Sequence, residues 1–208
     1  MISTLAFASC YVYSPAGAGV ISERSRLLRA LLKEGNAHFM LKYAVRVRQQ
    51  TEDSSRLAGF FLSNDVLVPV PRCSPRSRGT WVAAELAQAL VRAGVGGVAW
   101  PGLRRIRAVR KSAIAASGAR PTVACHYDSF EVESVSFRAA GVMLVDDVVT
   151  RGRTLLAAAA RLTEAFPGTP VRAFALLRTR GMVPGVEHLL EPCTGEIRWN
   201  GSDTRRTP

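Results

Sequence analysis

VMLVDDVVTRGRTL, residues 142–155, is the most informative segment of the chain. The continuous apolar run at 142–145 predicts a buried strand, and two adjacent carboxylates, Asp146 and Asp147, follow it directly. A strand that only filled a core would end in turn residues and would have no need of paired carboxylates. The pair therefore indicates a ligand at the carboxyl end of this strand.

Residues 150–154, TRGRT, predict a phosphate site beside that pair. A helix expected from about Thr154 would present its N-terminal N–H groups there, and Gly152 allows a close approach or a positive φ. Carboxylates would repel a phosphate bound alone, but they accept hydrogen bonds from the vicinal hydroxyls of a sugar. The segment therefore predicts a ribose 5-phosphate, with the sugar at the aspartates and the phosphate in the turn.

The rest of the chain predicts an α/β protein with a twisted, mostly parallel sheet flanked by helices on both faces. Alternation and β-branched runs predict strands at 1–13, 65–71, 97–100, 130–137, 142–146 and 171–177. Apolar residues at helical spacing predict helices at 22–35, 79–93 and 154–165, and we expect residues 200–208 to be frayed. In such sheets ligands bind beyond the carboxyl ends of the strands, where the two aspartates lie.

Composition limits the class of protein. The chain has 208 residues, enough for one domain with a real core, and no segment approaches the ~18 apolar residues of a membrane span. The four cysteines form no C-x-x-C pair, and no basic residue precedes the short apolar run near the N-terminus. We therefore expect neither zinc, nor a disulfide framework, nor a secretory signal, and we expect a cytoplasmic protein.

The net charge is +12, with 28 Lys and Arg against 16 Asp and Glu. A surface of this kind attracts nucleic acid or phosphorylated small molecules, but a general preference for arginine would produce the same excess. Both interpretations of the charge stay open, and a homodimer is a further candidate assembly.

The central segment resembles the 5-phosphoribosyl 1-diphosphate (PRPP) signature of type I phosphoribosyltransferases, an apolar strand followed by D/E-D, two apolar residues and T-T-G-x-T. The resemblance implies a core at about 60–180, a small hood from the terminal segments 1–60 and 180–200, and Mg²⁺ held mainly by the substrate. It implies that Asp146 and Asp147 bind the ribose hydroxyls in catalysis. It also implies a PRPP-binding loop made of Val148, Val149, Thr150, Arg151, Gly152, Arg153 and Thr154.

A second stretch, VPVP at 68–71, is followed by a basic segment and Arg78-Gly79. It resembles the pyrophosphate loop of competence protein F (ComF)-like phosphoribosyltransferases, although Trp81 stands where that subgroup has a small polar residue. The forked guanidinium group suits phosphate oxygens. Candidate ligands for the diphosphate are therefore Arg72, Arg76 and Arg78.

Residues 104–111, RRIRAVRK, carry five cations in eight positions. In similar enzymes a basic loop between two strands closes over the substrate, which makes Arg105, Arg107 and Lys111 candidate lid residues. A nucleic-acid track and an ordinary amphipathic helix face are the alternatives.

Two positions depart from the signature. Arg151 replaces its second threonine and Arg153 fills its variable position, so the two arginines either contact the phosphate or point outward. Thr150 stands where enzymes that salvage 6-oxopurines carry a carboxylate, which disfavours purine salvage. His126 and Asp128 are candidate general bases, although a lone histidine there is more often structural.

The sequence is consistent with three functions. The first is a phosphoribosyltransferase that displaces pyrophosphate from PRPP with a nitrogen nucleophile. The second is a non-catalytic PRPP- or nucleotide-binding accessory protein, linked to DNA uptake or processing. The third is a nucleic-acid-binding protein that uses its arginines directly.

Overall fold

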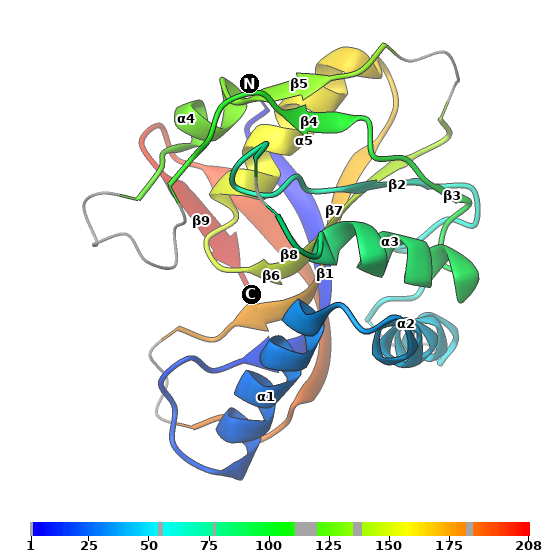
Figure 1. Ribbon diagram of the computed structural model, residues 1–208, viewed down its shortest axis with the longest axis vertical. Coiled ribbons are helices and arrows are strands. Elements are labelled where there is room, and N and C mark those ends of the chain that lie inside the picture. Colours follow the sequence, from blue (N-terminus) through cyan, green and yellow to red (C-terminus); the bar gives the residue numbers. More distant parts are fainter. Residues whose placement is uncertain (1, 54–55, 77, 111–119, 135–138, 182–184) are drawn as a thin grey trace.

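The computed structural model describes residues 2–53, 56–76, 78–110, 120–134, 139–181 and 185–208, and Figure 1 shows their arrangement. In chain order the elements are β1 (Thr4–Tyr13), α1 (Val20–Glu34), α2 (Ala37–Glu52), β2 (Val66–Pro69), α3 (Val82–Arg92), β3 (Val98–Ala99), β4 (Leu103–Arg105), α4 (Val123–Tyr127), β5 (Phe130–Val132), β6 (Val142–Val149), α5 (Arg153–Ala165), β7 (Val171–Thr179), β8 (Leu190–Trp199) and β9 (Thr204–Thr207).

Within the described residues, seven strands form one mixed sheet in the order β3-β2-β6-β7-β1-β8-β9. The first five in this order are parallel, and β8 and β9 continue the sheet with antiparallel pairing. The predicted α/β class with a mostly parallel sheet is confirmed. β6 lies in the interior of the sheet between β2 and β7, so its carboxyl end opens at the centre of one edge.

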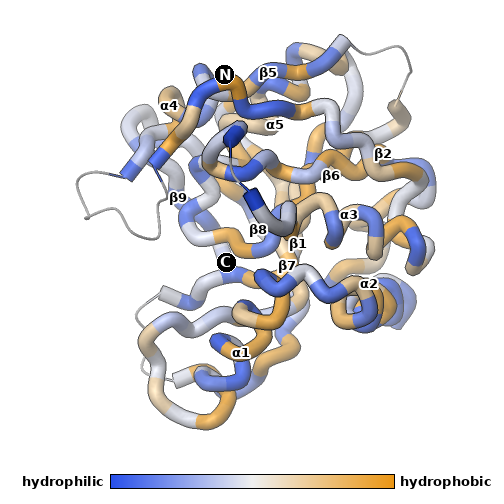
Figure 2. The backbone as a smooth tube through the Cα atoms, viewed as in Figure 1, coloured by the Kyte–Doolittle hydropathy of each residue, from blue (hydrophilic) through white to orange (hydrophobic). Residues whose placement is uncertain are grey.

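Helices cover both faces of the sheet, as the alternation of elements predicted. On one face Leu155, Leu156 and Leu162 of α5 pack against Val142, Leu144 and Phe7 of the strands. On the other face the apolar sides of α1, α2 and α3 pack against strand residues that include Met143, Val145 and Phe174. Figure 2 shows the apolar strands running through the middle of the molecule. The central strands are therefore packed between two apolar cores, which position the strand ends at one edge of the sheet.

Local signals explain where α1 ends and where α2 begins. The side chain of Asn36 accepts a hydrogen bond from the Phe39 N–H at the start of α2, and Gly35 closes α1 in the left-handed conformation with φ of 69°. The helix expected at 22–35 begins earlier, after Gly19, and Ser22 is buried within it. We did not predict α2 at all.

Parts of both terminal segments, which we expected to form a small hood, belong to the main sheet. β1 lies between β7 and β8 inside the main sheet, and β8 and β9 extend that sheet at its edge. The expected core of residues 60–180 was therefore too narrow. The expected frayed tail was also wrong, because Thr204–Thr207 form β9 and Thr204 is buried against β8.

Two strands also differ from expectation. β6 continues through Val149, so the aspartates lie within the strand and not beyond it. The strand expected at 130–137 is described only at its start, where β5 pairs with β4 in a separate two-stranded antiparallel sheet. Among the residues that are described, no helix combines the length and hydropathy needed to cross a membrane.

Candidate functional site

The site lies where β6 passes into α5. Residues 150–152 connect them, and Gly152 takes φ of 86° as the residue that caps α5. A Cβ atom on Gly152 would lie 2.5 Å from Cδ1 of Ile197, so glycine is required both by the backbone conformation and by the space. The sequence-based reason for glycine at this position is confirmed.

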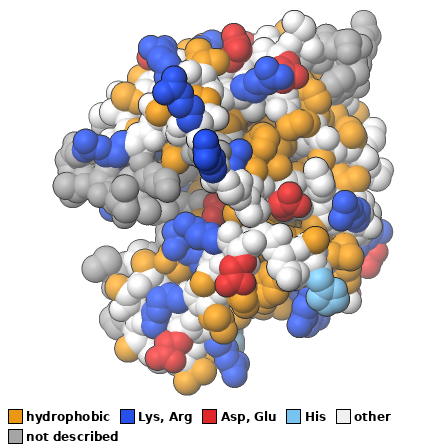
Figure 3. Space-filling model, in the orientation of Figure 1, with side chains coloured by type: hydrophobic (Ala, Val, Ile, Leu, Met, Phe, Trp, Pro, Cys, Tyr) orange, Lys and Arg blue, Asp and Glu red, His pale blue; other side chains and the backbone are white. Residues whose placement is uncertain are grey.

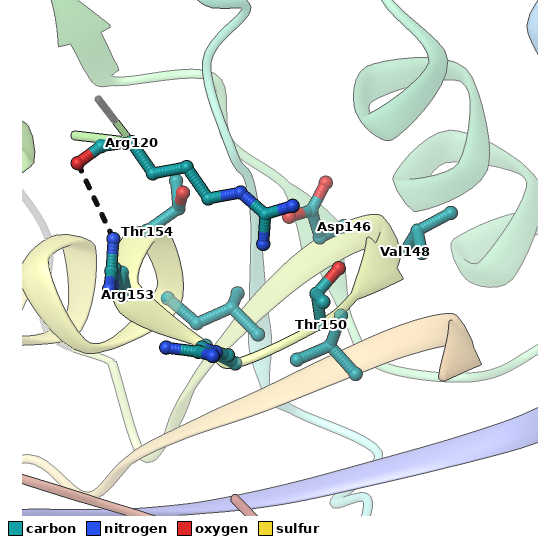
Figure 4. A pocket seen from close by; sticks show the side chains of 10 residues that line it. Arg120, Asp146, Val148, Thr150, Arg153 and Thr154 are labelled. Atoms are coloured by element: carbon teal, nitrogen blue, oxygen red, sulfur yellow. Dashed lines mark hydrogen bonds between the residues drawn. The ribbon is translucent and has the colours of Figure 1, made fainter. Parts of the chain in front are cut away.

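A cavity of about 220 Å³ opens over this turn and the first turn of α5. We call it the phosphate cavity. Its wall holds Asp146 and the turn residues, which the sequence predicted to lie together, and the side chain of Arg120 extends across it toward Asp146 (Figure 4). Its described lining consists of Arg120, Asp146, Val148, Val149, Thr150, Arg151, Gly152, Arg153, Thr154 and Leu155. The turn and the N-terminus of a helix of 13 residues offer backbone N–H groups to an anion there.

Asp146 and Asp147 form a strained electrostatic pair. Burial and the neighbouring charge of Asp147 raise the pKa of Asp146 well above its ordinary value, and the nearby Arg105 opposes this rise. The Asp147 N–H donates to Oδ1 of Asp146 at 2.9 Å, which holds that carboxyl group in place. Two carboxylates so placed gain from hydroxyl donors or from a cation that relieves their repulsion.

A larger groove of about 1010 Å³ adjoins the cavity and shares Asp146, Thr150 and Thr154 with it. Cations dominate its charge. Figure 3 shows Lys and Arg side chains around the hollow on this face of the molecule. The cations among its described lining are Arg29, Lys33, Arg72, Arg78, Arg105, Arg110 and Arg120, against the carboxylates of Asp146 and Asp147. The groove is therefore suited to a polyanion next to the aspartate pair.

Two of the three arginines predicted to bind the diphosphate lie in the groove. Arg72 and Arg78 line the groove, whereas exposed Arg76 does not occur in its described lining. Arg72 donates to the carbonyl of Gly79 at 2.5 Å, and the Trp81 indole donates to the carbonyl of Val70 at 2.8 Å. These two bonds hold the ends of the segment after β2 together, so Trp81 has a structural role where a small residue was expected.

The predicted lid does not begin as a loop. Arg105 lies in β4, with its guanidinium group against the Phe130 ring at 4.2 Å and donating to the Arg72 carbonyl at 2.8 Å. Burial lowers the pKa of Arg105 to about 10, so it remains a cation at neutral pH in the lining of the groove. Exposed Arg107 donates to the carbonyl of Asp128 at 2.7 Å and is not among the described groove residues, and Lys111 falls outside the described residues.

Arg151 of the turn and Arg153, the first residue of α5, bind the same carboxylate, Asp203. The Arg153 guanidinium group binds both oxygens of Asp203, with Nε–Oδ1 at 2.5 Å and Nη2–Oδ2 at 2.6 Å. Arg151 Nη1 lies 2.8 Å from Oδ2 of the same carboxylate. Both arginines thus line the cavity while their charged ends bind Asp203, an alternative that the sequence left undecided.

His126 is buried in α4 and does not face the groove as a general base. Its Nε2 atom lies 3.4 Å from the hydroxyl oxygen of Thr154, the second residue of α5. Burial and the charges of Arg105 and Arg153 lower its pKa to about 4, so the imidazole is neutral at pH 7. Asp128 is exposed and is absent from the described lining of the groove.

The sequence patterns did not predict several residues that line the site. Arg120 lines both the cavity and the groove, and Tyr13, Arg29 and Lys33 form a wall of the groove from β1 and α1. Arg29 stacks over the Tyr13 ring with its Cζ atom 5.2 Å from the ring centre. No motif surrounds these residues, because the fold brings them to the site from distant parts of the chain.

The described residues contain no group of three or more His, Cys, Asp or Glu side chains that could hold a metal ion by themselves. The aspartate pair nevertheless suits Mg²⁺ shared with a ligand, since Mg²⁺ prefers oxygen ligands and usually takes only one or two from protein carboxylates. The residues present thus fit a metal ion that arrives with phosphate oxygens.

Comparison with models of known protein families found no match, and no match to a curated protein was found.

Proposed function

We propose that this chain binds 5-phosphoribosyl 1-diphosphate and transfers its phosphoribosyl group to a nitrogen nucleophile. One observation carries the proposal. The paired carboxylates Asp146 and Asp147 lie beside a turn that opens a cavity at a helix N-terminus, and a cationic groove adjoins both. The α/β fold with this strand at the centre of its sheet is compatible with the type I phosphoribosyltransferase architecture that the sequence resembles.

Each part of the substrate has a place in this scheme. The 5-phosphate occupies the phosphate cavity, where the N–H groups of the turn and the hydroxyl of Thr154 bind it. The ribose hydroxyls donate to Asp146 and Asp147. The diphosphate extends along the groove toward Arg72, Arg78 and Arg110, because those side chains line its described wall.

The reaction breaks the bond between C1′ and the diphosphate oxygen, and the departing diphosphate takes the electron pair. The nitrogen of the acceptor forms the new bond to C1′ and releases a proton to solvent. The groove arginines stabilise the negative charge that develops on the diphosphate, and the aspartates fix the ribose ring. Mg²⁺ bound with the substrate would neutralise further diphosphate charge, and Asp146 and Asp147 are the residues that would help to hold it.

A binding protein without catalysis is the second candidate. Among the described residues of the groove, Asp146 and Asp147 are the carboxylates and no histidine occurs. The wall formed by Tyr13, Arg29 and Lys33 therefore offers an acceptor no evident proton acceptor. This observation favours an accessory role in which the ligand is held but not consumed.

Ligand binding tests what both candidates share. PRPP with Mg²⁺ should raise the melting temperature, because a ligand of the folded state adds RT ln(1 + [L]/Kd), about 2.7 kcal/mol at a hundredfold excess over Kd. The double variant Asp146→Asn with Asp147→Asn should lose this shift. The matched control is Glu52→Gln with Asp53→Asn, an adjacent exposed acidic pair at the end of α2. A full shift in the first double variant contradicts the ribose assignment.

Turnover separates the two candidates. Diphosphate release should be measured with PRPP, Mg²⁺ and a panel of nitrogenous bases and amines. Release that depends on both an acceptor and the two aspartates supports the transferase. Tight PRPP binding without release across the panel supports the accessory protein.

A further inference from the structure

The hairpin of β8 and β9 contacts residues 150–152, the turn between β6 and α5. Nε of Arg206 donates to the Thr150 carbonyl at 2.8 Å, and the same guanidinium group also donates to the carbonyl of Thr179. Ile197 of β8 fills the space beside Gly152. These contacts join the two ends of adjacent strands, β6 and β7, to the end of the chain.

Asp203 is the centre of this contact. It stands just before β9, accepts hydrogen bonds from Arg151 and Arg153, and is oriented by the Thr204 N–H, which donates to Oδ1 at 2.7 Å. Its own N–H donates to the Asn200 side chain at 2.8 Å. The hydrogen bonds from Arg153 lower the pKa of Asp203 below its ordinary range, so it is ionised throughout the neutral range.

Asp203 does not itself occur in the described lining of the phosphate cavity or of the groove. Its carboxylate instead binds the guanidinium groups of two arginines that line the cavity, Arg151 and Arg153. With both charged ends occupied, the turn presents its backbone N–H groups and Thr154 to an anion, while the arginines are held in place. Any effect of Asp203 on phosphate binding must therefore pass through the turn.

We propose that Asp203 is a positioning residue for phosphate binding: it holds Arg151 and Arg153 so that the turn between β6 and α5 keeps its anion-binding shape. This proposal rests on the proposed function, because it takes the turn to be the 5-phosphate site. It also accounts for Arg151 and Arg153, the two positions that depart from the phosphoribosyltransferase signature, since Asp203 pairs with them from 52 and 50 residues away in the sequence. The end of the chain is thereby part of the site.

The test compares two ligands that occupy opposite ends of the site. Isothermal titration measures ribose 5-phosphate and, separately, pyrophosphate with Mg²⁺, using wild type, Asp203→Asn and Asp203→Glu. The control is Glu196→Gln, which also neutralises an acid of this hairpin but one that pairs with the exposed Arg198. Asp203→Asn should weaken ribose 5-phosphate binding by about tenfold or more, because small displacements of a preorganised site are costly. Its pyrophosphate affinity should stay within about twofold of wild type.

Asp203→Glu, which keeps the carboxylate, should recover part of the ribose 5-phosphate affinity, and Glu196→Gln should bind both ligands as wild type does. Unchanged or tighter ribose 5-phosphate binding by Asp203→Asn overturns the proposal, because freed arginines would then act as direct ligands. Equal weakening of both ligands also overturns it, as the sign of a general structural effect. If wild type binds no ribose 5-phosphate, the proposed function itself fails, which is a separate outcome.

Discussion

The Nε2 atom of His126 lies 3.4 Å from the hydroxyl oxygen of Thr154, and this contact joins α4 to the first turn of α5. Nδ1 of His126 is buried without a hydrogen-bond partner among the described residues. A proton on Nε2 gives that nitrogen a partner and leaves no buried N–H group unpaired. The Thr154 hydroxyl can then donate to a ligand in the phosphate cavity.

This contact predicts how stability depends on pH. The pKa of His126 falls from 6.5 to about 4 on folding, so the unfolded chain binds the extra proton between these values. The titration of His126 therefore does not change the free energy of unfolding above pH 6.5. As pH falls from 6.5 toward 4, it lowers that free energy by an amount on the order of 3 kcal/mol.

His126→Gln removes the titration and should flatten this part of the stability profile in urea unfolding between pH 7 and pH 4.5. The exposed His38→Gln is the matched control and should follow wild type. Parallel profiles for wild type and His126→Gln would contradict the buried, neutral imidazole.

Two glycines with positive φ predict different costs of substitution. Gly168 has φ of 77° and nothing within 4 Å of an added Cβ, whereas at Gly152 that atom would meet Ile197. Gly168→Ala should lower the free energy of unfolding by about 1–2 kcal/mol, the cost of the left-handed backbone. Gly152→Ala should cost more and should also abolish binding of ribose 5-phosphate. Urea unfolding measures the two stability costs, and titration measures ribose 5-phosphate binding. Equal stability costs at the two sites would show that the Ile197 side chain moves to make room for the added methyl group.

The ion pair of Asp65 and Arg172 predicts a large stability effect away from the site. Nη2 of Arg172 lies 2.7 Å and 2.9 Å from the two carboxylate oxygens of Asp65, which is fully buried and also accepts from the Leu62 N–H. Asp65→Asn should cost about 3–5 kcal/mol, because it leaves a largely buried charge uncompensated.

The exposed pair of Arg48 and Glu52 provides the comparison. Glu52→Gln should change the free energy of unfolding by less than about 1 kcal/mol. A similarly small effect for Asp65→Asn would mean that water reaches Arg172 in the variant.

The groove arginines separate a diphosphate site from a nucleic-acid track. Arg78→Gln with Arg110→Gln should weaken pyrophosphate binding by about tenfold or more, since charge-assisted hydrogen bonds are lost. Arg24→Gln with Arg76→Gln removes the same charge from exposed positions that do not occur in the described groove lining, and should leave pyrophosphate binding intact.

A nucleic-acid track gives a different pattern in filter binding across a salt series. There the groove variant would keep its pyrophosphate affinity, and the log–log slope for DNA would fall by about 0.7–0.9 for each lost phosphate contact. This result would favour direct nucleic-acid binding over the proposed function.

The sequence alone determined the elements whose signals are local. The apolar run of β6, the acidic pair, Gly152 and the periodic face of α5 lie within about one strand and one helix, so the sequence pattern that predicts them is local. The class of the fold followed from the same local signals, because alternating strands and helices have few ways to cover a parallel sheet. The candidate ligand also followed from these residues.

Tertiary structure alone decided what the distant residues do. β1 lies inside the sheet between β7 and β8. The sequence could not predict this position, because both partners lie more than 150 residues further along the chain and no pattern within β1 identifies them. The sequence also does not predict where the Arg153 side chain points, because its partner Asp203 is placed beside it by the pairing of β8 with β9. A charged side chain on the surface has many partners of similar energy, and the one that it takes is set by strand pairing across the whole sheet, which local sequence does not encode.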